Sequence, residues 1–219
     1  MIRSIKALRL LFFLLPTSTV MAQTTTALSP SPAGTYYLEG AHEVASGFLL
    51  RPDSSFAFFF SYGALDRYGS GSWTRGDLGS IILNSPASPG RDYRLVRQFR
   101  TKEAANLIQL EASDPVFYTY TYCRVVSGNR VTEQPFDSHG WLRLPSGPID
   151  SIELKFAFAE EKTAVFAIKG DPANNFVFGI EPWLLEVFFR HFTLQFKGDR
   201  LEGAHPLLKE KTWVFRKEE

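Results

Sequence analysis

Apolar and aromatic side chains alternate with other residues over much of the chain after Gly34. In the clearest run, Phe56, Phe58 and Phe60 alternate with Ala57 and Phe59. Successive side chains of a strand point to opposite faces, so each such run predicts a strand with one apolar face. Further runs with this period lie at residues 118–122, 152–158, 176–180, 192–196 and 213–215.

Short groups of turn-forming residues separate these runs. Residues 51–54, for example, read Arg-Pro-Asp-Ser and suit a type I turn with proline at its second position. Glycine-containing groups follow at residues 127–129, 138–140, 169–172 and 197–199. Short strands with turns at this spacing predict an all-β fold, either an antiparallel β-barrel or a sandwich.

One segment departs from the period of two. Residues 182–190 begin with Pro182, which the first turn of a helix tolerates. Apolar residues at 183, 184, 187 and 188 then share one helical face. The same residues also fit a strand that is apolar on both sides. We favour a short helix that closes one end of the sheet.

The first 22 residues have the three-part pattern of a secretory signal peptide. Three basic residues precede an apolar run at 10–15, and Val20 and Ala22 place small side chains where a signal peptidase cleaves. The apolar run is too short for the roughly 30 Å hydrocarbon core of a bilayer. We therefore expect cleavage after Ala22, no membrane span in the mature chain, and export to the periplasm or out of the cell.

The rest of the chain has the size of one domain. Residues 23–33 are rich in Thr, Ser and Pro without periodicity and predict a flexible linker. Residues 34–219 then form a single β domain. This domain is either one continuous β structure or a structure that carries a small β-sandwich insertion near residues 105–160.

The two ends of this domain each have a characteristic order of strands and turns. At the start, a tyrosine-rich strand after Gly34 and an apolar strand ending at Pro52 precede the aromatic strand and the Gly-Ser-Trp group at 71–73. At the end, residues 192–196 meet a Gly-Asp turn before the last strand, 213–216. Both ends resemble the lipocalin-like domains of exported bacterial proteins, and the resemblance implies a β-barrel with an aromatic interior. The Gly-x-Trp group lies further along the domain than in true lipocalins.

The middle of the chain is similar to something else. Residues 122–154 resemble small carboxypeptidase-regulatory-like β-sandwich modules, in which an Asp-x-x-Gly turn precedes a strand. Asp137 to Gly140 supply that turn here. This second resemblance implies the inserted sandwich.

Composition narrows the classes of function. The 219 residues carry 24 basic and 23 acidic side chains, and this balance gives no electrostatic case for binding nucleic acid. Aromatic residues reach 15%, which favours an aromatic core or an aromatic ligand wall. Cys123 is the single cysteine. We therefore expect no disulfide within the chain, and a Cys123 buried in a strand rather than one acting as a nucleophile.

A five-residue repeat offers a candidate metal site. The sequence LEGAH occurs at residues 38–42 and again at 201–205. If the first and last strands are neighbours, the repeat supplies two carboxylates and two imidazoles, which suit Zn²⁺ or another divalent metal. The four candidate ligands are Glu39, His42, Glu202 and His205. Alternatively both copies mark similar strand-to-turn exits, in which case no cofactor is expected.

Two groups of residues are candidate ligand contacts. One is the aromatic wall of the Phe-rich strand with a following tryptophan, and the other is the segment 61–69, predicted to be a loop at the mouth of a cavity. The residues assigned to ligand binding are Phe56, Phe58, Phe60, Tyr62, Asp66, Arg67 and Trp73. The alternatives are a filled core and a structured turn. For Tyr118, Tyr120 and Tyr122 we expect cross-strand packing rather than a platform for sugar rings.

Motifs of catalysis are missing. Asp137, Ser138 and His139 are adjacent, but neighbours in an extended chain point apart, so they predict no triad. The sequence also lacks a Gly-x-Ser-x-Gly elbow, a His-Glu-x-x-His pair, a Cys-x-x-Cys pair and a phosphate-binding Gly-Lys-Ser loop. No catalytic residue is therefore assigned.

These observations together predict an exported, non-enzymatic envelope protein that binds an apolar or amphipathic small molecule. One alternative is a metal-dependent hydrolase that uses the repeated Glu and His residues. Another is a structural β module that recruits an envelope protein through exposed sheet edges.

Overall fold

The computed structural model describes residues 30–63, 65–209 and 212–219. The chain divides into two units, Met1–Pro30 and Ser31–Glu219, and all the elements below belong to the second. The signal peptide predicted at 1–22, and most of the linker predicted at 23–33, lie outside the described residues.

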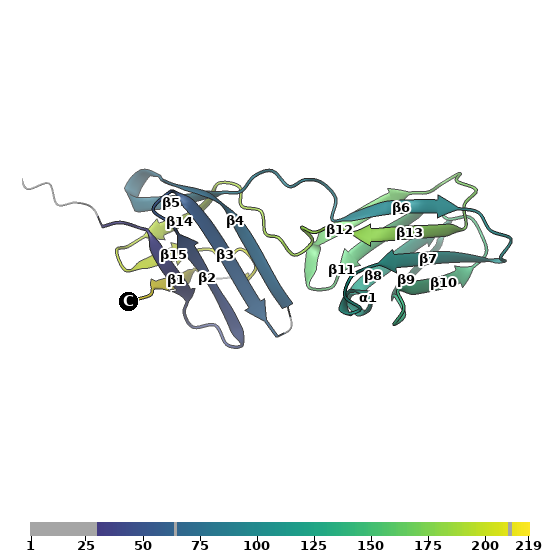
Figure 1. Ribbon diagram of the computed structural model, residues 1–219, viewed down its shortest axis with the longest axis horizontal. Coiled ribbons are helices and arrows are strands. Elements are labelled where there is room, and N and C mark those ends of the chain that lie inside the picture. Colours follow the sequence, from purple (N-terminus) through teal and green to yellow (C-terminus); the bar gives the residue numbers. More distant parts are fainter. Residues whose placement is uncertain (1–29, 64, 210–211) are drawn as a thin grey trace, which may run out of the picture. The chain divides into compact units, whose positions relative to one another are not determined.

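Eight strands form a closed antiparallel barrel (Figure 1). Each strand pairs with the next one along the barrel, and the last pairs with the first, so the barrel is an up-and-down meander interrupted between β5 and β14. A 3-10 turn, Asp77–Gly79, precedes β5. The barrel strands are β1 (Gly34–Leu38), β2 (Val44–Leu50), β3 (Ser55–Tyr62), β4 (Leu65–Arg75), β5 (Ser80–Asn84), β14 (Phe192–Phe196), β15 (Arg200–Gly203) and β16 (Trp213–Lys217).

The barrel interior is filled by large side chains. In β3, Phe56, Phe58 and Phe60 are buried and alternate with partly exposed neighbours, as the period of two predicts. Phe189, which belongs to no barrel strand, is also buried there. The buried side chains of this core are Tyr36, Phe48, Leu50, Phe56, Phe58, Phe60, Trp73, Ile81, Leu83, Phe189, Leu194, Leu201, Trp213 and Phe215.

A second set of strands is inserted between β5 and β14 and forms two four-stranded sheets (Figure 1). One sheet has the order β10-β7-β13-β6, with β13 parallel to β7, and the other has the antiparallel order β12-β11-β8-β9. The predicted range 105–160 falls inside this span. The inserted elements are β6 (Tyr93–Phe99), β7 (Ala105–Glu111), α1 (Val116–Tyr120), β8 (Thr121–Ser127), β9 (Arg130–Pro135), β10 (Trp141–Pro145), β11 (Ser151–Phe156), β12 (Ala159–Ala167) and β13 (Asn175–Ile180).

The two inserted sheets share one hydrophobic core, separate from that of the barrel, and we call this part the sandwich. It is built mostly from alternating positions of both sheets, such as Ile152 and Leu154 of β11 against Phe176 and Phe178 of β13. Cys123 is fully buried in it, on β8, as the sequence predicted. The all-β fold predicted from the sequence is thus present as a barrel and as a sandwich.

Two local predictions are wrong. The helix expected at 182–190 does not form, and turns take its place. Leu184 is buried in the sandwich core, whereas the backbone N–H of Val187 donates to the carbonyl of Tyr68 on β4, and one continuous helix does not meet both contacts. A short helix forms instead at α1, where a strand was expected for Tyr118 and Tyr120. Asp114 explains it, because its carboxylate accepts the backbone N–H of Val116 at the start of the turn.

The segment 61–69, expected to be a loop, is also different. Most of its residues belong to β3 and β4, which pair directly from Tyr62 and Leu65 onward. Strand alternation therefore sends Asp66 and Arg67 to opposite faces. In the described part of the chain, no helix is both long and apolar enough to cross a membrane.

Candidate functional site

The repeated LEGAH segments do not assemble a metal site. Glu39 forms an ion pair with Arg216, at 2.6 Å, and Glu202 pairs with Arg200, also at 2.6 Å. Hydrogen bonds from Lys197 and Arg200 hold the pKa of Glu202 below its usual value. Within residues 30–63, 65–209 and 212–219, no three His, Cys, Asp or Glu side chains lie close enough to hold a metal ion.

His205 has a structural position instead. Its Nδ1 accepts the backbone N–H groups of Leu207 and Leu208, both at 3.0 Å. The Nε2 atom therefore carries the proton and donates to Ser46 Oγ at 3.0 Å, and that hydroxyl donates to the carbonyl of Phe59. Burial lowers the pKa of His205 to about 4. The ring is neutral and fully hydrogen-bonded, whereas His42 of the other copy is exposed.

The predicted aromatic ligand wall is packed into the barrel core. Phe56 and Phe58 contact the ring of Phe189, with centroids 5.1 and 5.4 Å apart, and Phe60 lies 5.6 Å from the ring of His205. Trp73 donates its Nε1 proton to the carbonyl of Arg51. Contacts within the protein therefore occupy these four side chains.

Arg67 is also structural. Its side chain is 3% exposed, and Nη2 donates to Glu161 Oε1 of β12 at 2.6 Å. Another ion pair, between Lys162 and Asp92 at 3.0 Å, is buried on both sides, whereas the Glu161 side chain is 56% exposed. Burying a charge is unfavourable unless it is paired, so Glu161 and Asp92 offset the cost of burying the charges of Arg67 and Lys162. They also line a pocket together with Phe188 and Lys209.

The other candidates, Tyr62 and Asp66, do line a pocket. It measures about 230 Å³, and we call it the aromatic pocket. Its wall comes from the β3–β4 hairpin, α1 and the β11–β12 hairpin, three places that sequence reasoning did not connect. The lining residues are Tyr62, Gly63, Leu65, Asp66, Val116, Phe117, Tyr120, Phe156, Phe158 and Leu185.

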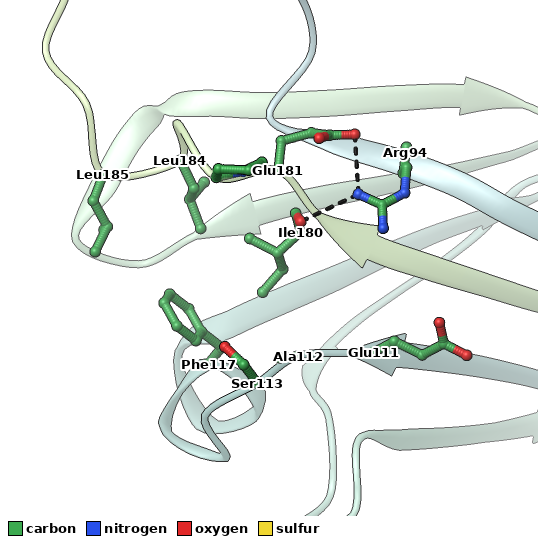
Figure 2. Close-up of a pocket in the computed structure, with 10 residues that line it drawn as sticks. Arg94, Glu111, Ala112, Ser113, Phe117, Ile180, Glu181, Leu184 and Leu185 are labelled. Carbon is green, nitrogen blue, oxygen red and sulfur yellow. Dashed lines mark hydrogen bonds and ion pairs between the residues drawn. The ribbon is translucent and has the colours of Figure 1, made fainter.

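A larger pocket of about 540 Å³ opens at the end of the sandwich where β7 stops and α1 begins (Figure 2). We call it the end pocket, and sequence reasoning missed it. It shares Phe117 and Leu185 with the aromatic pocket. The residues that line it are Arg94, Glu111, Ala112, Ser113, Phe117, Ile180, Glu181, Pro182, Leu184 and Leu185.

The end pocket has an apolar side and a charged side. Figure 2 shows Ile180 pointing toward Phe117, with Leu184 and Leu185 nearby. On the charged side, Arg94 Nη1 lies 3.2 Å from Glu181 Oε1 and donates to the carbonyl of Ile180 at 3.4 Å. Glu181 is only 15% exposed, so its carboxylate holds the guanidinium in one place.

A glycine lets this arginine lie against the sheet. Gly179 pairs with Arg94 across β13 and β6, and a Cβ atom at Gly179 would lie 3.0 Å from Cζ of Arg94. Any side chain there would push the guanidinium away from the strand. A glycine within a strand, between Phe178 and Ile180, was the one sequence signal that could have pointed to this close approach.

The Cys123 thiol and the Asp137 carboxylate, two groups that can act in catalysis, have structural positions here. Burial raises the pKa of the Cys123 thiol well above its usual value, which keeps it protonated and unreactive. The Asp137 carboxylate accepts the backbone N–H groups of His139 and Trp141, both at 2.8 Å, so it shapes a turn and does not orient an imidazole. Hydrogen bonding from Trp141 accordingly lowers the pKa of Asp137.

Comparison with protein-family models, with curated proteins and with solved structures finds no match.

Proposed function

We propose that the protein is a non-catalytic binding protein that holds an amphipathic small molecule in the end pocket. The observation that carries this proposal is an arginine, fixed by a partly buried glutamate, on one side of a pocket whose other side is apolar. Such pockets bind ligands through apolar contact and orient them through a few fixed polar groups.

The size and lining suggest how the ligand lies. A volume of about 540 Å³ falls within the usual range for small-molecule sites. An apolar body would contact Phe117, Ile180 and Leu184, and a polar end would lie near Arg94. The Arg94 side chain is 55% exposed, so its remaining N–H donors can reach an anionic or hydrogen-bonding group.

This proposal keeps the predicted ligand class and moves it away from the barrel. The barrel is an up-and-down meander, which supports the resemblance to lipocalin-like domains. Phe189 and its neighbouring rings fill its interior, however, so the barrel serves better as a scaffold. Export through a signal peptide stays part of the proposal.

The test is an NMR titration of the mature chain with 8-anilinonaphthalene-1-sulfonate, a probe with apolar rings and one anionic group. We expect shifts at residues 94, 111–117 and 180–185. Changing Ser113, an exposed lining residue, to Trp should fill the pocket and abolish them. Arg94→Met should weaken binding about tenfold, the effect of losing one charged hydrogen bond.

Thr119→Trp is the matched control, because Thr119 is exposed on α1 and does not line the end pocket. It should bind like the wild type. Circular dichroism of each variant checks that it remains folded. Equal binding by Ser113→Trp and the wild type, or shifts confined to other residues, would overturn the proposal.

A further inference from the structure

The aromatic pocket concentrates exposed apolar surface that a folded chain normally buries. Tyr62 is 49% exposed, Phe158 43% and Val116 41%, and all three line this one pocket. They come from a barrel hairpin, a sandwich hairpin and α1, so no single element accounts for their meeting. Exposed apolar residues scattered singly need no explanation, but a cluster around a hollow points to a ligand.

The rings of this pocket support one another. The centroids of Tyr120 and Phe158 are 4.6 Å apart, those of Phe117 and Phe156 are 5.6 Å apart, and Phe156 and Phe158 lie 5.9 Å apart edge to face. These contacts join four rings into one wall, with Tyr62 supplied from the barrel hairpin. The wall is thus held in place before any ligand arrives.

The charge of the pocket has one sign. Asp66 is the one charged residue among its described lining residues. The Asp66 side chain is exposed, and within the described part of the chain its carboxylate has no hydrogen-bond or ion-pair partner. Arg67, the next residue, turns to the other face of β4 and is neutralised by Glu161. The pocket therefore presents aromatic faces and a single negative charge.

We propose that the aromatic pocket binds an organic cation, such as a quaternary ammonium group. Aromatic faces attract such cations through their negative quadrupole, and a carboxylate at the rim adds a charge of the complementary sign. A volume of about 230 Å³ suits a compact headgroup. This site goes beyond the proposed function, because most of its lining residues differ from those of the end pocket and its ligand carries the opposite charge.

The experiment compares choline with 3,3-dimethyl-1-butanol, in which a carbon replaces the charged nitrogen at nearly the same size. Binding to the mature chain is followed by NMR. We expect choline to shift residues of α1, Tyr62 and Phe158, and to bind about five- to tenfold more tightly than the neutral alcohol. Equal affinity of the two compounds would overturn the proposal, and so would choline shifts only elsewhere.

Two variants test the two components separately. Asp66→Asn removes the charge and keeps the shape, while Phe158→Leu keeps an apolar side chain and removes one aromatic face. Each should weaken choline binding several-fold and leave the alcohol unaffected. Glu133→Gln, an exposed acid on β9, is the matched control and should change neither. Unchanged choline binding in both test variants would overturn the proposal.

The two sites can fail independently. Ser113→Trp should block the anionic probe in the end pocket and leave choline bound, because Ser113 does not line the aromatic pocket. Asp66→Asn should weaken choline binding several-fold and leave the anionic probe bound. If Ser113→Trp also abolishes choline binding in a folded protein, choline occupies the end pocket and the separate cation site is wrong.

Discussion

The barrel and the sandwich both consist mainly of antiparallel strands, but the barrel is closed whereas the sandwich sheets have free edges. Each barrel strand has a hydrogen-bonded neighbour on both sides, and aromatic rings fill the interior. The sandwich has four edge strands and a core richer in aliphatic side chains, and both the end pocket and the aromatic pocket involve its end. The closed barrel has an interior filled by aromatic rings, which leaves little space for a ligand. The sandwich is open at its end, and pockets form there.

The sandwich edges carry features that discourage pairing with another chain. On β6, Arg94 and Arg97 are exposed, and on β9 Arg130 and Glu133 are exposed. Charged residues on an edge strand oppose the addition of a further strand. The open edges are therefore weaker candidates for partner recruitment than the pockets are for small molecules.

The largest expected effect concerns Phe189, which belongs to no barrel strand but whose ring is buried in the barrel core. Its ring is 2% exposed and lies within 6.0 Å, centroid to centroid, of Phe48, Phe56 and Phe58. We expect Phe189→Ala to lower the free energy of unfolding by about 3–5 kcal/mol, as for other buried phenylalanines. Urea unfolding measures this.

Phe99→Ala in the sandwich is the matched control. Phe99 lies on edge strand β6 and is 44% exposed, so its loss should cost less than about 1 kcal/mol. Similar losses for the two variants would show that Phe189 does not close the barrel core, and would reopen the interior as a ligand site.

Strand β3 shows how much of the fold the sequence pattern predicts. Phe56, Phe58 and Phe60 alternate, so strand, face and burial all followed from local pattern. The alternation could not tell a ligand wall from a filled core, because the deciding ring, Phe189, lies more than a hundred positions further along the chain. The closure of β1 on β16 is likewise a long-range contact that no local pattern encodes.

The second prediction uses the pH dependence of the barrel. Burial lowers the folded-state pKa of His205 to about 4, against an ordinary value of 6.5, so the unfolded chain takes up the proton first as the pH falls. Stability from this group is complete above pH 6.5 and is lost as the pH falls toward 4. The loss has an upper limit of about 3 kcal/mol.

Urea unfolding across that pH range, in the wild type and in His205→Gln, isolates this contribution from that of the carboxylates. The wild type should lose more stability on acidification than the variant does. His139→Gln is the control from the sandwich, because His139 is exposed in a turn, and its pH curve should match the wild type. Parallel curves for wild type and His205→Gln would contradict a neutral, buried imidazole.

The pockets were harder to predict from the sequence, because their walls come from segments that lie far apart along the chain. Tyr62 and Asp66 were assigned to ligand binding because they lie near a predicted turn, and both line the aromatic pocket. Their partners Phe117 and Phe158 come from α1 and from the β11–β12 hairpin, and no local pattern predicts which hairpins meet. Arg67 was chosen by the same reasoning but is buried, since strand alternation turned it away from Asp66.

The third prediction tests how closely the segment before β14 lies on the barrel. A Cβ atom at Gly69 would be 2.6 Å from the carbonyl oxygen of Val187 and 2.7 Å from the Phe189 ring. Gly69→Ala should therefore destabilise the protein by about 1–3 kcal/mol through overpacking. Ser70→Ala, at the exposed neighbouring position, should change stability by less than about 0.5 kcal/mol. A neutral Gly69→Ala in urea unfolding would mean that this segment moves away from β4 with little resistance.

The smallest expected effect lies on the outer face of the sandwich. Arg97 and Glu111 flank β13 and form an ion pair at 3.2 Å, with side chains 55% and 42% exposed. A double-mutant cycle with Arg97→Met and Glu111→Gln should give a coupling energy below about 1 kcal/mol. Because solvent surrounds the pair, about 0.5 M salt should reduce the coupling further. A coupling energy well above that value and insensitive to salt would show that this face of the sandwich is shielded from water. The sandwich would then differ from the closed barrel only at its open ends.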